Sequence, residues 1–161
     1  MKLEPTDAFE RLGLPRRFAV DLGELERNYL ARSREVHPDF HAGSTDAVED
    51  AAAALNEAYV TLRDPFRRAE HLLKWLGGPG ASEDKNLPPA FLMEMLELRE
   101  EIESAKGTPA DVARIETALM ARTAALEATL PALFDAGNLP VIRRELNCVR
   151  YLTGLIRDLH S

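Results

Sequence analysis

Three consecutive residues, His37, Pro38 and Asp39, have the types and spacing to take part in chemistry. Proline disfavours helical geometry in the residue before it and cannot donate a backbone hydrogen bond, so a helix that reaches this point must end here. The tripeptide therefore places an imidazole and a carboxylate on a stiff corner between two segments that we expect to be helical. Polar side chains at such a loop tip are typical of a functional site.

Together with His41, the same segment reads H-x-D-x-H, and its side chains are of types that ligate metal ions. A metal site also needs further ligands and hydrogen-bond partners that hold them in place. The remaining histidines, His71 and His160, lie far away in the sequence. A metal-dependent protein that uses His37, Asp39 and His41 is therefore kept as an alternative, and we expect no metal and no cofactor.

The composition bounds the class of protein. The chain has 161 residues, 45% of them hydrophobic and 29% charged, which is typical of a soluble globular protein of one domain or two small ones. Its net charge of −7 does not favour binding to nucleic acid. The single cysteine, Cys148, excludes an intramolecular disulfide, and its apolar neighbours at helical spacing predict a buried thiol rather than a nucleophile.

No segment of the sequence is suited to a membrane or to export. No apolar run approaches the roughly 20 residues of a membrane span. The first nine residues contain Glu4 and Asp7 and lack the apolar core of a signal peptide. We therefore expect a cytoplasmic protein.

Helices are expected along almost the whole chain, because apolar residues recur at helical spacing and no strand-like alternation is found. Capping and breaking residues such as Asp21, Pro65 and Gly107 set the predicted limits. Pro131 should kink or divide the helix that contains it. The predicted helices cover about residues 7–12, 22–36, 46–63, 65–76, 89–106, 110–135 and 140–160.

A run of glycine and proline at residues 77–80, followed by polar residues, is the clearest break in the pattern. We place a linker at residues 77–88, between one domain at residues 1–76 and another at residues 89–161. The last three helices predict an antiparallel three-helix bundle. The fold class is all-α in two parts.

The helix at residues 22–36 has an apolar side and a basic side. Leu22, Leu25 and Tyr29 share the apolar side, whereas Arg27 and Arg34 lie together on the opposite side, seven residues apart. Arginines on an exposed helix face often serve only solubility. In a chain that is acidic overall, a basic stripe leading to the tripeptide instead indicates an acidic protein partner.

The hairpin, the basic face and the His37-Pro38-Asp39 loop together resemble a J-domain. The resemblance implies docking on an ATP-driven chaperone of the DnaK type and stimulation of its ATP hydrolysis. It assigns stimulation to the tripeptide and docking contacts to Arg27 and Arg34. The sequence departs from the pattern at Phe40, because the residue after the tripeptide is commonly basic in J-domains.

The helix at residues 89–106 has two apolar stripes. Phe91, Met95 and Ile102 belong to the stripe that closes the bundle. A second stripe, roughly 150° away, contains Leu92, Met93 and Leu96 and is rimmed by glutamates. An apolar patch with a charged rim predicts a protein-binding site, and packing against the first domain is the alternative. On the last helix, Tyr151 is expected to point away from the side that faces the bundle core, and so to serve as an anchor residue in a contact with a partner protein.

At these residues the chain resembles the HscB family, the J-type co-chaperones of iron–sulfur cluster assembly. The likeness includes Phe-x-x-Leu-Gly-Leu-Pro at residues 9–15, Thr-Leu-Arg-Asp-Pro at residues 61–65, and the run at residues 91–101. It implies a J-domain hairpin followed by a C-terminal bundle that binds the cluster scaffold protein, IscU. The scaffold-binding residues that it implies are Leu92, Met93, Leu96, Glu97, Glu100 and Tyr151.

The sequence thus predicts a two-site co-chaperone rather than an enzyme. The resemblance implies that it delivers the scaffold to a DnaK-type or HscA-type chaperone, stimulates ATP hydrolysis by that chaperone and promotes cluster transfer. The sequence contains no phosphate-binding loop, no glycine-rich fingerprint and no paired catalytic carboxylates. A J-domain adaptor for another client remains the alternative within this class.

Overall fold

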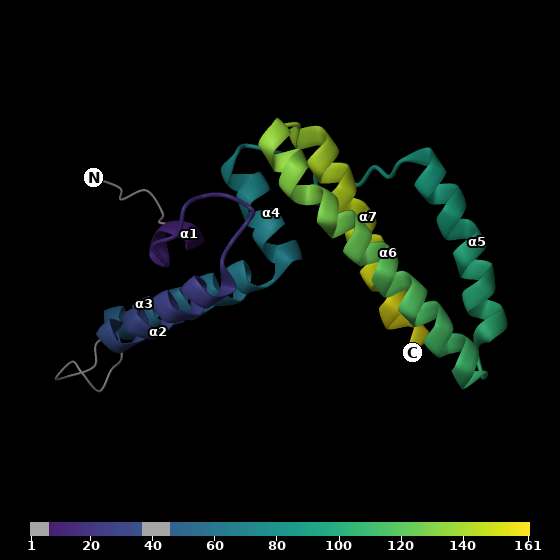
Figure 1. The fold of residues 1–161 in the computed structure, drawn as a ribbon, viewed down its shortest axis with the longest axis horizontal. Helices are drawn as coiled ribbons and strands as arrows, with labels where there is room; N and C mark the ends of the chain where they lie inside the picture. Colours follow the sequence, from purple (N-terminus) through teal and green to yellow (C-terminus); the bar gives the residue numbers. More distant parts are fainter. Residues whose placement is uncertain (1–6, 37–45) are drawn as a thin grey trace. The chain divides into compact units, whose positions relative to one another are not determined.

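The computed structural model describes residues 7–36 and 46–161, and every regular element in these ranges is an α-helix (Figure 1). The all-α prediction is therefore confirmed. The residues from His37 to His41, which include the tripeptide and Phe40, lie outside the described residues. The helices are α1 (Ala8–Arg11), α2 (Leu22–Val36), α3 (Asp46–Arg63), α4 (Pro65–Trp75), α5 (Pro89–Ala105), α6 (Pro109–Ala136) and α7 (Leu139–Leu159).

Aspartate side chains cap the N-terminal ends of α2 and α4. The Asp21 carboxylate accepts hydrogen bonds from the backbone N–H of Gly23 and Glu24, at 2.9 and 3.1 Å. The Asp64 carboxylate accepts one from the N–H of Arg67 at 2.9 Å. Such caps satisfy backbone donors that have no partner within the helix. The predicted starts of α2 and α4 are correct because these contacts are local in sequence.

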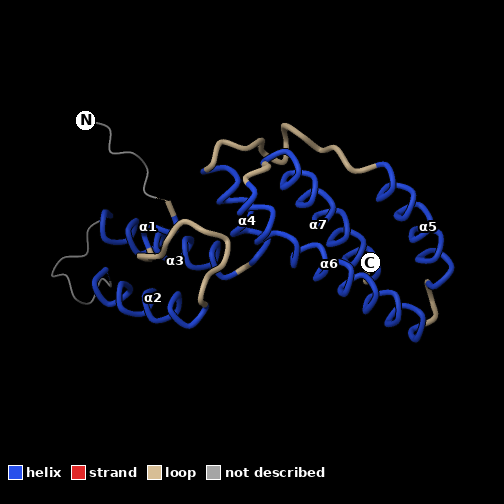
Figure 2. Tube along the Cα trace, turned by 45° about the horizontal axis from the view of Figure 1, so that its top comes forward, coloured by secondary structure: helices blue, strands red, loops and turns tan. Residues whose placement is uncertain are grey.

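The chain divides into two compact units, Met1–Trp75 and Leu76–Ser161. In the first unit, α2 and α3 lie side by side as a helical pair (Figure 2). The rings of Tyr29 and Tyr59 stack across this pair with centroids 4.2 Å apart, and the Tyr29 hydroxyl donates to Asn56 at 3.2 Å. Leu25 is buried as predicted, but Leu22 is 53% exposed. Leu22 is the first residue of α2, so no preceding turn of that helix covers it.

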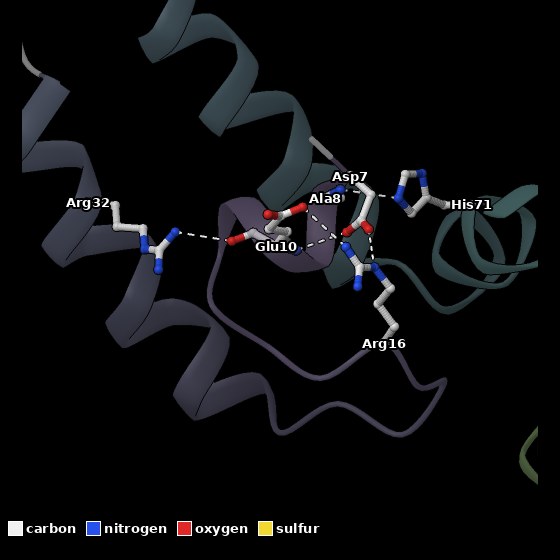
Figure 3. A network of polar contacts seen from close by, with 6 residues as sticks. All are labelled: Asp7, Ala8, Glu10, Arg16, Arg32 and His71. Atoms are coloured by element: carbon white, nitrogen blue, oxygen red, sulfur yellow. Dashed lines mark hydrogen bonds and ion pairs between the residues drawn. The ribbon is translucent and has the colours of Figure 1, made fainter. Parts of the chain in front are cut away.

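Two polar side chains of α2 bind the C-terminal end of α1. The Arg32 guanidinium donates to the carbonyl oxygens of Glu10, at 3.2 Å, and Arg11 (Figure 3). The Asn28 amide donates to the carbonyl of Leu12 at 2.8 Å. Gly13 follows with φ of +64°, and a Cβ there would lie 2.8 Å from the Arg32 guanidinium. Arg32 therefore stabilises the fold of the first unit, at the end of α1 where carbonyl groups lack helical partners.

A second polar network joins α1 to α4 (Figure 3). The Asp7 carboxylate caps α1 and pairs with Arg16, and the backbone N–H of Ala8 donates to Nε2 of His71 at 3.2 Å. Burial acts to raise the pKa of Asp7, but the hydrogen bonds and positive charge around it outweigh burial and lower that pKa. Burial lowers the pKa of His71, an effect that Asp7 opposes and Lys74 reinforces. Because Nε2 accepts a hydrogen bond, the imidazole is neutral in this arrangement.

Replacing His71 with Gln should make the stability of the protein less dependent on pH. The pKa of His71 is lower in the folded state than in the unfolded state, so the unfolded state binds the proton more readily. The stability that neutral His71 supplies is therefore complete above the unfolded pKa and is lost as the pH falls through the folded pKa. Urea unfolding of both proteins between about pH 5 and about pH 7.5 measures the effect.

Taking the difference between the two free energies of unfolding cancels the contribution of the other titrating groups. We expect the advantage of the wild type over His71→Gln to shrink as the pH falls. Parallel pH profiles for the two proteins would contradict this role of His71.

In the second unit, α6 packs against both α5 and α7. Helical spacing predicts one apolar core stripe on α6, made of Val112, Ile115, Leu119, Leu126, Leu130 and Leu133. Ile115, Leu119, Leu126 and Leu130 are buried, whereas Val112 and Leu133 near the two ends of the helix are half-buried. Of the two effects predicted for Pro131, a kink or a division, the division is not observed, because α6 continues to Ala136. Pro131 is exposed, and losing one backbone hydrogen bond is tolerated in a long helix whose other face is packed on its neighbours.

Helix α7 buries two polar side chains, which the apolar pattern did not predict. Arg143 is fully buried and its Nε donates to the side-chain oxygen of Asn147 at 3.0 Å. The Asn147 amide nitrogen donates in turn to the carbonyl oxygens of Asp84 and Asn86, at 3.0 and 2.9 Å. Arg143 also donates to the carbonyl of Pro79 at 3.4 Å. Residues 79–86, predicted as part of a linker, are therefore hydrogen-bonded to α7.

Candidate protein-docking surfaces

An apolar patch lies on the outer side of α5. Its members, Leu92, Met93 and Leu96, are 43%, 63% and 60% exposed. We call these three residues the α5 patch. The other stripe of the same helix is buried at Phe91 and Met95, so α5 contributes to the core through one side only. Large exposed side chains that adjoin one another indicate a binding surface.

Glutamates border the α5 patch on one side. Glu97 and Glu100 are exposed, and with Glu101 they line a hollow of about 660 Å³ near the end of α5. Glu94 has a different role, because its carboxylate pairs with Arg122 of α6 at 3.0 and 3.3 Å. Of the glutamates in this helix, Glu97 and Glu100 thus face solvent next to the patch, whereas Glu94 joins two helices of the bundle.

Tyr151 lies between α7 and α5 rather than pointing away from the bundle. Its ring meets Phe91 edge to face, with centroids 5.9 Å apart and planes at 84°. Arg99 donates from Nε to the Tyr151 hydroxyl at 2.6 Å, and its guanidinium lies over the same ring. Tyr151 is half-buried as a result. Sequence spacing missed Arg99, because its partner is 52 residues away along the chain.

On the first unit, Arg27 and Arg34 are both exposed on α2. Leu30, which the sequence reasoning did not select, is 51% exposed and lies one helical turn from each of them. The basic face of α2 therefore includes an apolar side chain, and helical spacing could have identified it. The tripeptide follows Val36, the last residue of α2.

Cys148 is buried in the bundle, as its spacing predicts. Burial, followed by the negative charge of Glu145, raises the pKa of its thiol to about 11. The thiol is therefore protonated at neutral pH and is a poor nucleophile and a poor metal ligand. Residues 7–36 and 46–161 hold no group of three or more histidine, cysteine or acidic side chains suited to a metal ion. The alternative site at His37, Asp39 and His41 lies outside this part of the chain.

The two units match two family models. Residues 7–71 match the DnaJ domain, and residues 87–160 match the HSCB C-terminal oligomerisation domain. A protein of Burkholderia mallei, described as a co-chaperone protein HscB homolog, is 39% identical over 147 residues, which cover 84% of each chain. The chain belongs to the HscB family of co-chaperones. The predicted family and the predicted J-domain with a C-terminal HscB bundle are thereby confirmed.

Other members of the HscB family agree with this assignment. The HscB homolog of Chromobacterium violaceum is 42% identical over 117 residues, which cover 69% of this chain and 65% of that protein. The solved structure of the chaperone HscB from Vibrio cholerae superposes with a TM-score of 0.80 at 30% identity, covering 96% of this chain and 95% of the other. Within the described residues, none of the helices is long and apolar enough to cross a membrane.

The contact between Arg99 and Tyr151 can be tested by a double-mutant cycle. Tyr151→Phe keeps the edge contact with Phe91 but loses the hydroxyl that accepts from Arg99. We expect Tyr151→Phe and Arg99→Ala to be coupled by about 0.5–1 kcal/mol in urea unfolding, as for one exposed hydrogen bond. Tyr151→Ala should cost more, about 2 kcal/mol, because the ring contact is lost as well. Strictly additive effects of Tyr151→Phe and Arg99→Ala would show that the hydrogen bond from Arg99 to the Tyr151 hydroxyl does not form in solution.

Proposed function

We propose that this HscB-family co-chaperone delivers an IscU-type iron–sulfur scaffold protein to a DnaK-type or HscA-type chaperone and stimulates ATP hydrolysis by that chaperone. Stimulation draws the chaperone into its tight-binding state around the delivered scaffold, which promotes cluster transfer to acceptor proteins. The cluster is cargo of the scaffold, and the co-chaperone needs no cofactor of its own. The compartment in which we place this activity is the cytoplasm.

The observation that carries the proposal is the α5 patch. Three large apolar side chains are exposed together on the unit that matches the HSCB C-terminal model, with Glu97 and Glu100 beside them. We propose that the scaffold binds the α5 patch, Glu97, Glu100 and Tyr151. Apolar contacts would supply most of the affinity, since buried interface centres are apolar, while the glutamates would select a basic rim on the scaffold.

The first unit supports the second half of the proposal. Arg27 and Arg34 present positive charge on the exposed side of α2, in a domain that matches the DnaJ model. We propose that they dock on an acidic surface of the chaperone, and that His37, Pro38 and Asp39 then stimulate hydrolysis. Arg32 is excluded from this docking role, because its guanidinium is bound to the carbonyls of Glu10 and Arg11.

Replacing His37 with Gln should abolish stimulation of the cognate chaperone while leaving the fold intact. Glutamine keeps similar bulk but cannot reproduce the imidazole, and a loop substitution usually changes stability by less than about 0.5 kcal/mol. The measurement is steady-state ATP hydrolysis by the chaperone, with scaffold present, on titration with each protein. The matched fold control is binding of the scaffold, which His37→Gln should leave unchanged. Equal stimulation by wild type and His37→Gln would sink the J-domain mechanism.

Truncating the α5 patch should weaken binding of the scaffold and leave stimulation of the chaperone unchanged, which is the reverse of what we expect for His37→Gln. Leu92→Ala with Leu96→Ala removes two exposed apolar side chains, and we expect the dissociation constant of the scaffold to rise roughly 10- to 100-fold. Stimulation of the chaperone without scaffold should not change, because these residues lie in the other unit. Met120→Ala is a matched control, since Met120 on α6 is 58% exposed, close to the 60% of Leu96. Unchanged scaffold affinity in the double variant would refute the assignment of this surface.

An adaptor for a different client is the alternative within the same class. The α5 patch would then bind that client, and the J-domain would act in the same way. Binding of the purified chain to a panel of candidate clients separates the two. Preference for the scaffold over the other proteins favours the proposal made above.

A further inference from the structure

A cavity of about 350 Å³ lies between α7 and the segment that precedes α5. The preceding segment contributes Ala81, Lys85 and Leu87 to its wall, and α7 contributes Asn147, Arg150 and Tyr151. We call this cavity the α7 pocket. Its volume is within the range of sites that accept a few side chains or a small ligand. Of its wall residues, Tyr151 alone belongs to the scaffold-binding surface proposed above.

The wall of the α7 pocket is held in place before any partner arrives. Asn147 is buried, and its amide nitrogen donates to the carbonyls of Asp84 and Asn86. Arg143 holds the Asn147 side chain in this orientation by donating a hydrogen bond to its oxygen. The N–H of Asn86 also donates to the Asp84 carboxylate at 2.9 Å. Because these bonds fix the segment on α7, a partner would not have to order it on binding, which lowers the cost of association.

The chemistry of the pocket is both basic and apolar. Lys85 and Arg150 bring two positive charges to its wall, in a chain whose net charge is −7. Leu87, Ala81 and the ring of Tyr151 bring apolar surface. A carboxylate next to an apolar side chain satisfies both features at once, because its charge is complementary to the two cations.

The α7 pocket is continuous with the proposed scaffold surface through Tyr151. This residue lines the pocket and also contacts Phe91 and Arg99 of α5. The combined surface therefore carries positive charge at the pocket, from Lys85 and Arg150, and beside Tyr151, from Arg99, and negative charge beside the α5 patch, from Glu97 and Glu100. A surface of this kind favours one orientation of its partner over the reverse, because the reverse brings like charges together.

We infer that the α7 pocket is a second contact for the scaffold protein and receives a segment of it that carries a carboxylate beside an apolar side chain. This inference rests on the proposed scaffold-binding function. The α5 patch would supply the apolar centre of the complex, and the pocket would set the direction in which the scaffold lies across α5 and α7.

Calorimetric titration of the full-length chain with the cognate scaffold protein tests the inference. Lys85→Glu and Arg150→Glu should each raise the dissociation constant roughly tenfold, because a like charge then faces the bound carboxylate. Arg157→Glu is the matched control: it makes the same charge change on an exposed residue of α7, about 10 Å further along the helix axis. It should change the dissociation constant by no more than about twofold, since solvent screens that distance.

A second variant tests the pocket without changing charge. Ala81→Leu adds bulk to the wall, so the occupant can no longer enter fully, and the dissociation constant should again rise. Stimulation of the chaperone in the absence of scaffold and the circular dichroism spectrum report whether each variant is folded. A scaffold variant with one exposed carboxylate changed to lysine should regain affinity for the Lys85→Glu chain, and that rescue identifies the residue that enters.

The outcomes separate this inference from the function on which it rests. If Leu96→Ala weakens binding but Lys85→Glu and Arg150→Glu behave like Arg157→Glu, the α7 pocket is not a contact and the α5 patch stands. If none of the exposed scaffold carboxylates gives rescue, the carboxylate occupant is wrong. If the wild type does not bind the scaffold at all, both proposals fall.

Discussion

Helix α5 carries more apolar surface than a three-helix bundle can bury, and the proposed function depends on this excess. A helix that packs on one side of a bundle needs a single apolar stripe. Phe91 and Met95 meet that need, and the side chains of the α5 patch remain exposed in consequence. Leaving apolar side chains in water forfeits about 25 cal/mol for each Å² that burial would remove from solvent. A partner that covers the patch recovers that free energy, so the same residues that fail to stabilise the fold can stabilise a complex.

Charged residues of one type have different roles in the two units, and the contacts decide which role each takes. Arg27, Arg32 and Arg34 all belong to α2. Arg32 binds carbonyl groups at the end of α1, whereas Arg27 and Arg34 are exposed to solvent. Glu94 pairs with Arg122 inside the bundle, whereas Glu97 faces solvent. Charges that are engaged within the fold position the helices. The exposed ones can steer and orient a partner.

Buried polar side chains of α7 extend the second unit beyond its three helices. Arg143 and Asn147 bind the carbonyls of the segment at residues 79–86, whose backbone would otherwise need other partners for its polar groups. This attachment forms one wall of the α7 pocket. Tyr151 is half-buried between α7 and α5 for a related reason, because Arg99 binds its hydroxyl and Phe91 meets its ring. The candidate binding surface is thus built from α5, α7 and the attached segment together.

The sequence alone predicted the helix limits, the all-α class and the four buried residues of the α6 stripe, because caps, proline and helical periodicity are local properties. The family was indicated separately, by the resemblance of short motifs along the chain to those of the HscB family. Only the tertiary structure decided that the second stripe of α5, at Leu92, Met93 and Leu96, is exposed, since helical periodicity does not show whether another part of the chain covers an apolar stripe. Tertiary contacts also decided the partner of Arg99 and the burial of Arg143 and Asn147. The hydrogen bonds from these residues to other segments of the chain span 52 to 64 residues of sequence. Local patterns carry no information about such distant pairs, and the hydrogen bonds that make burial of a polar side chain tolerable appear only when the chain is folded.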